Sequence, residues 1–168
     1  MLTIIALALA LAITTQDSSD RHVRAAEPRI SALIDAGLSG SATFRGLVAT
    51  LDESDVIVYI ERKMTRPNLG GYLSHQVVAR GGYRYLRIAV ETQGSDGRLV
   101  PLLAHELQHA VEVAQTPEAR DAEGLVQLFS QRAVLFGCGG RCVETQAAKD
   151  VEHVVGGELK AERRSARK

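Results

Sequence analysis

The spacing of apolar and polar positions predicts helices, then strands, then helices along the chain. Apolar residues recur at helical spacing in two short segments, one at 29–36 and one from Ser39 or Ser41 to about Leu51. Either serine can act as the N-cap of the second helix. A β-branched run follows at 56–60, and its continuous apolar character predicts a central strand covered on both faces.

A hairpin is predicted next, because a Gly81-Gly82 turn separates two strand-like segments at 72–79 and 83–92. The second segment places its apolar side chains on one face, and its charged side chains are expected to point mostly outward. The apolar residues are Leu86, Ile88 and Val90, and the charged residues are Arg84, Arg87 and Glu91. This pattern is typical of a half-buried strand.

Two helices are predicted after the hairpin. The first spans about 97–114 and has apolar residues on nearly all sides, so it is expected to be a buried central helix. Pro101 falls in its first turn, where a missing N–H is tolerated. Thr116-Pro117 predicts the start of the next helix, which is expected to run to about Phe136.

A loop at 137–142 leads to a last helix, which is predicted to start near 143 and to be weakened by Gly156-Gly157. A basic tail at 161–168 follows. Helices, strands and helices in this order indicate the α+β class. The expected architecture is a small, mainly antiparallel sheet packed on a buried helix and on C-terminal helices.

The N-terminal part is interpreted as an export signal followed by a linker. Residues 1–12 are apolar and uncharged and end in small residues, so 1–16 are taken as a probable signal peptide. A helix of about twelve residues spans roughly 18 Å, short of the ~30 Å hydrocarbon core, so no stable membrane span is expected. Residues 17–28 are interpreted as a linker and 29–160 as one domain. We expect a periplasmic or secreted protein, or one anchored by an uncleaved signal.

Composition and charge indicate a single domain and argue against nucleic acid or a lipid surface as binding partners. The chain has 168 residues and 45% hydrophobic residues, which suits one globular domain. Lys plus Arg equals Asp plus Glu at 20 each, so no net field attracts nucleic acid or anionic lipid. The basic cluster at 160–168 lacks interleaved aromatic residues, which favours a solvated tail over a nucleic-acid patch.

The two cysteines, Cys138 and Cys142, lie in the segment F-G-C-G-G-R-C. In an oxidising compartment a disulfide between them is expected. The alternative is one half of a zinc site. That reading is disfavoured, because a structural zinc site needs four ligands and the chain has no second cysteine pair.

The segment H-E-L-Q-H, from His105 to His109, contains the candidate metal-binding and catalytic residues. Histidines at i and i+4 lie on one face of a helix and can occupy two adjacent positions of a zinc tetrahedron. Glu106 is turned about 100° around the helix, where it can act as general base toward a zinc-activated water. These titratable residues interrupt an otherwise apolar helix. Burial without a metal or partners costs about 1–3 kcal/mol for each unsatisfied group, so a metal site is favoured over ordinary polar residues.

This segment resembles the active-site helix of the HExxH zinc metallopeptidases, the zincins. Uncharged Leu107 and Gln108 between the histidines and apolar residues after them match that pattern. The resemblance implies a zincin-like fold, one Zn²⁺ bound by His105 and His109, and Glu106 as the catalytic residue. It also implies a strand that holds a peptide or protein substrate by β-addition, for which 83–92 is the candidate.

The metzincin branch is excluded, because it requires Gly at position 112 and His at 115, where this chain has Glu112 and Gln115. A gluzincin-like arrangement of a small exported bacterial type remains, with a glutamate from a later helix as third ligand. Glu144 is the preferred candidate, because its neighbours form an apolar face that a carboxylate would occupy only with a partner. Glu123 and His153 stay open as alternatives.

The expected function is therefore peptide-bond hydrolysis by a zinc metalloendopeptidase. The metal ligands would be His105, His109 and Glu144, and Glu106 would be the general base. The alternative is a non-catalytic metal-binding or interaction module that keeps the site for stability. A closed coordination sphere would favour that alternative, whereas a site with one open position would favour the enzyme.

Overall fold

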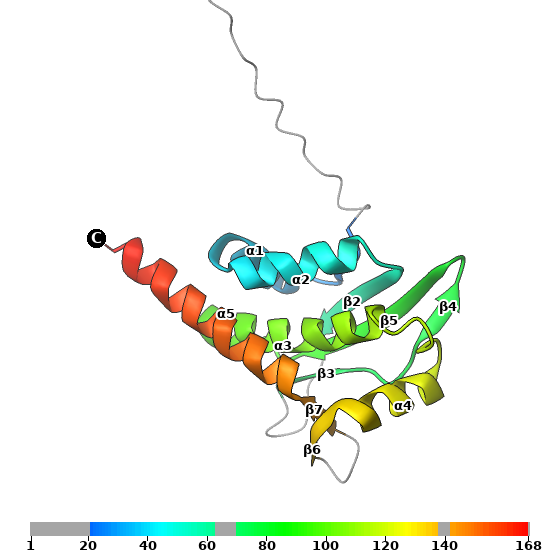
Figure 1. The fold of residues 1–168 in the computed structure, drawn as a ribbon. Coiled ribbons are helices and arrows are strands. Elements are labelled where there is room, and N and C mark those ends of the chain that lie inside the picture. Colours follow the sequence, from blue (N-terminus) through cyan, green and yellow to red (C-terminus); the bar gives the residue numbers. More distant parts are fainter. Residues whose placement is uncertain (1–20, 63–69, 138–141, 168) are drawn as a thin grey trace, which may run out of the picture.

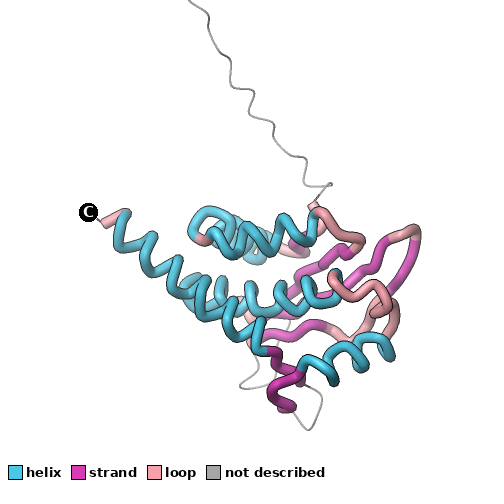
Figure 2. Tube along the Cα trace, in the orientation of Figure 1, coloured by secondary structure: helices cyan, strands magenta, loops and turns pink. Residues whose placement is uncertain are grey.

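The computed structural model describes residues 21–62, 70–137 and 142–167, which form the layers of helix and strand in Figures 1 and 2. The predicted signal peptide at 1–16 lies outside this part. The α+β class is confirmed. Within the described residues no helix has the length and apolar character needed to cross a bilayer.

The main sheet has the strand order β1-β2-β5-β3, with β4 also paired to β5. These strands are β1 Val23–Ala25, β2 Val56–Arg62, β3 Gly71–Leu73, β4 Val78–Arg80 and β5 Tyr83–Val90. As predicted, β2 lies between two other strands, but its outer face is only partly covered, since Tyr59 is 39% exposed. The expectation of a mainly antiparallel sheet is wrong, because β1, β2 and β5 are mutually parallel. β3 and β4 run antiparallel to β5.

The parallel pairing of β1 with β2 arises because part of the predicted linker forms a strand. Residues 23–25, inside the 17–28 segment, form β1, and Val23 pairs with Val58. The chain between β1 and β2 contains two helices, α1 Pro28–Gly40 and α2 Ala42–Asp52. A helical crossover returns the chain to the same end of the sheet, which makes the two strands parallel.

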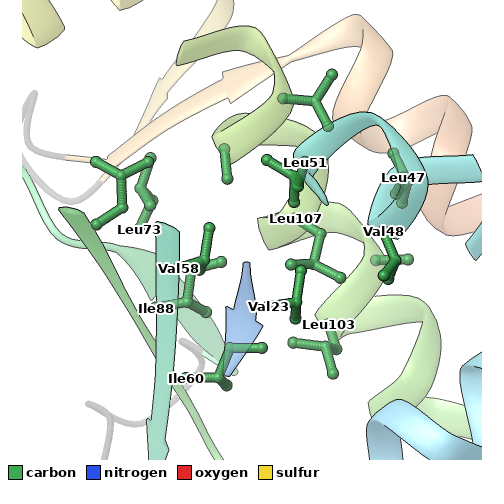
Figure 3. Close-up of a cluster of buried hydrophobic side chains, with 14 of the residues drawn as sticks. Val23, Leu47, Val48, Leu51, Val58, Ile60, Leu73, Ile88, Leu103 and Leu107 are labelled. Carbon is green, nitrogen blue, oxygen red and sulfur yellow. The ribbon is translucent and has the colours of Figure 1, made fainter. Parts of the chain in front are cut away.

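One face of the sheet meets the helices in a single apolar core (Figure 3). Side chains of β2 and β5, such as Val58 and Ile88, point toward Leu103 and Leu107 of α3 Asp96–Ala114. The buried central helix predicted at 97–114 is confirmed. Ser41 is the N-cap of α2, as one of the two alternatives proposed, and its side chain accepts from the Phe44 N–H.

The region after α3 differs from its prediction. The helix expected from Thr116-Pro117 to Phe136 is shorter, since α4 spans Ala122–Arg132 and Asp121 is its N-cap. The following residues form β6 Ala133–Gly137, which pairs antiparallel with β7 Cys142–Thr145. The run V-L-F in β6 suits a strand, and pairing with β7 outweighs continuation of the helix.

The last helix, α5 Gln146–Ser165, continues through Gly156-Gly157 and into the predicted tail. It crosses α3, and the two helices pack along much of their length (Figure 1). Gly156 lies at this crossing, where an added Cβ would be 3.7 Å from Pro101 Cγ of α3. Packing against α3 thus stabilises a helix that the glycine pair would weaken in isolation.

Arg84 is buried, with no exposed surface, contrary to the expectation that it points outward. It shares the inner face of β5 with Leu86 and Ile88. Its guanidinium donates to both carboxylate oxygens of Asp55, at 2.6 and 2.9 Å. It also donates to backbone carbonyls at the C-terminal end of α3, including Val113 at 2.8 Å and Thr116 at 2.7 Å. Carbonyls at the C-terminal end of a helix carry the negative end of its dipole, which explains how a buried cation is tolerated here.

The Asp55→Asn variant tests whether Arg84 and Asp55 together cap the C-terminal end of α3. The Arg84 guanidinium holds the pKa of Asp55 below its ordinary 3.8. The carboxylate therefore stabilises the fold above pH 3.8, and the contribution is lost as pH falls through the lowered pKa. We expect the variant to lose about 1–2 kcal/mol of unfolding free energy at pH 7, since the pair is partly solvated.

Chemical denaturation at pH 7 and at pH 3 measures the free energy of unfolding of both proteins. We expect the difference between wild type and variant to be smaller at pH 3. Asp35→Asn, at an exposed position of α1, is the matched control. Equal stability of wild type and Asp55→Asn at pH 7 would contradict the proposed cap.

Candidate functional site

The H-E-L-Q-H residues lie on α3 within the core of the molecule. His105, Glu106 and His109 are 6%, 5% and 4% exposed, so each has to be paired with another polar group. The rings of His105 and His109 meet edge to face, with centroids 5.0 Å apart, as the i, i+4 spacing predicts. His109 also packs edge to face on Phe129 of α4.

Glu144 reaches this helix from β7. Its Oε2 is 3.1 Å from Nε2 of His105, so the third ligand preferred from the sequence lies beside the first. Glu144 was expected in the last helix but belongs to the strand just before it. Thr145 follows and is the N-cap of α5, accepting from the Ala148 N–H at 3.2 Å.

Each histidine has a carboxylate at Nδ1, which for His105 is the second one after Glu144. Nδ1 of His105 is 3.0 Å from Oε2 of Glu152 on α5. Nδ1 of His109 is 3.0 Å from Oε2 of Glu112, and Oε1 of Glu112 accepts from the Thr145 hydroxyl at 2.7 Å. Carboxylates in this position orient metal-binding histidines in proteins and leave Nε2 for the metal.

The sequence reasoning assigned no role to either of these carboxylates. Glu112 carries a local signal, because a lone carboxylate in the apolar run A-V-E-V-A of a buried helix needs a partner. Glu152 carries no such signal. Its contact with His105 depends on how α5 crosses α3, and a periodicity pattern contains no information about that crossing.

Glu106 packs against strand β3. A Cβ added at Gly71 would lie 3.1 Å from Glu106 Oε1, so the glycine leaves room for the carboxylate. Burial raises the pKa of Glu106 to about 7, although both histidines and a hydrogen bond from the Leu73 backbone lower it. A carboxylate with this pKa is matched to proton transfer near neutral pH.

His105 and Glu144 form an ion pair. Burial alone would lower the pKa of His105, but hydrogen bonds to Glu144 and Glu152 raise it to about 10. The same bond to His105 lowers the pKa of Glu144. His105 is therefore protonated near neutral pH, and its Nε2–H donates to Oε2 of Glu144.

The side chains of His105, His109 and Glu144 are of the types that bind zinc, since two imidazoles and one carboxylate are the protein ligands in one kind of catalytic zinc site. The 3.1 Å between His105 Nε2 and Glu144 Oε2 is close to the ligand separation of about 3.3 Å in a tetrahedron with bonds near 2.0 Å. Across the described residues, however, no three His, Cys, Asp or Glu side chains converge closely enough to hold a metal as they stand. A set of three ligands from His105, His109 and Glu144 would therefore require their donor atoms to approach one another further.

The other candidates lie elsewhere. Glu123 is exposed in the first turn of α4. His153 is exposed on α5, where it lines an open groove of about 440 Å³ with Lys149 and Lys160. Cys138 is outside the described residues, so the disulfide with Cys142 stays a prediction, as does export.

The strand predicted to hold substrate also needs correction. Residues 83–92 contain β5, which is paired with β2 on one side and with β3 and β4 on the other, so it is not an edge strand. Strand β3 is the antiparallel strand at the end of the sheet order, and it is the strand that contacts Glu106.

Searches with family models, among curated proteins and among solved structures found no match to this chain.

Gly71→Ala tests the contact between β3 and Glu106. The added methyl group would crowd Glu106 and the Ala89 carbonyl oxygen, 3.3 Å away. We expect a loss of about 1–3 kcal/mol in unfolding free energy, measured by chemical denaturation.

Gly46→Ala is the matched control, because a Cβ there meets nothing within 4 Å on an exposed part of α2. It should raise stability, by up to about 1 kcal/mol. Equal responses of the two variants would show that Gly71 does not make room for Glu106.

Proposed function

We propose that the protein is a single-zinc peptidase of the zincin type, with a gluzincin-like ligand set of His105, His109 and Glu144. The observation that carries the proposal is the 3.1 Å approach of Glu144 Oε2 to Nε2 of His105. Glu144 comes from a segment remote from α3 in sequence, yet it meets the ring nitrogen that the H-E-L-Q-H spacing reserves for a metal.

The chain's own residues then have distinct roles. His105 and His109 would bind through Nε2, since their Nδ1 atoms are engaged by Glu152 and Glu112. Glu144 would exchange its proton-bridged contact for a bond to the metal. Zinc, when bound, supplies the Lewis acidity that makes a water molecule acidic near pH 7 and polarises a carbonyl group.

Glu106 would be the general base. Its carboxylate accepts the proton of the attacking water and delivers it to the leaving amine, and its raised pKa of about 7 suits both steps. Strand β3 borders this carboxylate, and an extended peptide added to the edge of β3 would bring a scissile bond near Glu106. A peptide or protein segment is therefore the proposed substrate class.

Glu106→Gln separates metal binding from catalysis. We expect one equivalent of zinc to remain, because the substituted side chain is not a ligand and a neutral group is tolerated at this buried position. Hydrolysis of fluorescein-labelled casein should fall about 10²–10⁴-fold, because the general base is lost.

Glu123→Gln applies the same chemical change to an exposed glutamate and should leave both zinc content and casein hydrolysis unchanged. Full hydrolysis by Glu106→Gln would contradict the mechanism. Zinc binding by a wild-type protein that hydrolyses neither casein nor a peptide library would favour the non-catalytic module.

Metal analysis of Glu144→Ala beside Glu123→Ala identifies the third ligand. Loss of Glu144 should weaken zinc binding sharply, since one of three protein ligands is removed, whereas Glu123→Ala should keep one equivalent. Inductively coupled plasma mass spectrometry after dialysis measures the stoichiometry. A wild type that contains no zinc after incubation with the ion would refute the proposal, and loss of zinc only in Glu123→Ala would reassign the ligand.

A further inference from the structure

Glu112 is a buried carboxylate whose two oxygens serve different parts of the molecule. The residue is 3% exposed, so it depends on its partners for compensation of the lost hydration. Oε2 accepts from Nδ1 of His109, three residues earlier on α3. Oε1 accepts from the hydroxyl of Thr145, which lies at the junction of β7 and α5.

Thr145 occupies a junction that determines where Glu144 lies. It is the residue directly after Glu144, and it is 2% exposed. Its hydroxyl donates to Glu112 and accepts from the Ala148 N–H as the N-cap of α5. The position of this hydroxyl therefore fixes the backbone that carries Glu144 relative to α3.

We propose that Glu112 is a positioning residue that orients His109 and locates Glu144 together, so that one buried carboxylate sets the geometry of two of the three metal ligands. This inference rests on the proposed zinc site. A hydrogen bond at Nδ1 holds the ring of His109 with Nε2 directed away from Glu112. The second bond, to Thr145, ties the segment of the third ligand to the helix of the first two.

Glu152 provides the comparison within the same chain. It makes the equivalent bond, 3.0 Å, to Nδ1 of His105, but its side chain is 44% exposed, against 3% for that of Glu112. Among the described residues, no hydrogen bond joins Glu152 to the β7–α5 junction, where Glu112 accepts from Thr145. Water can replace an exposed partner, so removal of the Glu152 carboxylate should matter less for metal affinity.

The experiment compares Glu112→Gln and Glu152→Gln with wild type by competition for zinc against a chelating dye. Thermal unfolding of the metal-free proteins is measured alongside. We expect Glu112→Gln to bind zinc about 10–100-fold more weakly and Glu152→Gln to show a clearly smaller loss. Glutamine has an acceptor oxygen at only one of the two carboxylate positions, so it cannot accept from His109 at one end and from Thr145 at the other.

Substitutions at Thr145 test the second bond and do not alter a charge. Thr145→Ser keeps the hydroxyl and should retain wild-type affinity, whereas Thr145→Val has the same shape without it and should bind zinc more weakly. Asp121→Ala removes the N-cap of α4 at the Gly124 N–H. This helix meets His109 through the ring of Phe129 but does not provide the Glu112 hydrogen bonds, so the variant should leave zinc affinity unchanged. This control separates the loss of a helix cap from the loss of the Glu112 contact.

The outcomes distinguish the two proposals. If wild type binds zinc and Glu112→Gln binds it equally well, the positioning role is refuted while the zinc site stands. If Glu112→Gln fails to fold, the two Thr145 variants test the proposal instead. Equal zinc affinity of Thr145→Ser and Thr145→Val refutes the positioning role, and weaker binding by Thr145→Val alone supports it. A wild type that binds no zinc would remove the zinc site and this inference with it.

Discussion

The pairing of four titratable side chains on a buried helix is the constraint on which the rest of the structure depends. His105, Glu106, His109 and Glu112 all lie on α3 within the core. No buried side-chain polar atom in the described part lacks a hydrogen-bond partner. Since unsatisfied polar groups are costly in such surroundings, the segments that surround α3 have to supply matching groups.

Three neighbouring segments meet this requirement. Strand β3 accommodates Glu106 beside Gly71, β7 brings Glu144 to His105, and α5 brings Glu152 to the other side of the same ring. The crossing of α5 over α3 is thus part of the site as well as of the core (Figure 1). The polar contacts fix how these elements meet, and the apolar contacts in Figure 3 supply most of the driving force for burial.

The same principle acts at the other end of α3. Arg84 extends from β5 to the last carbonyl groups of the helix, and Asp55 neutralises its charge. The helix is therefore held by polar contacts at its C-terminal end and around its histidines. A helix anchored in this way keeps its side chains in a narrow set of positions, which is what a metal or catalytic site requires.

The sequence alone predicted the features set by local interactions: the buried helix, the histidines on one face, the central strand, and Ser41 as one of two alternatives for a helix cap. Each depends on residues within one or two turns or along one strand. The parallel sheet, the burial of Arg84, the β6–β7 hairpin and the partners Glu112 and Glu152 were missed or misread. Those features arise where segments far apart in the chain meet, and tertiary packing decides them. The motif determined which atoms need partners, and only the fold determined which residues provide them.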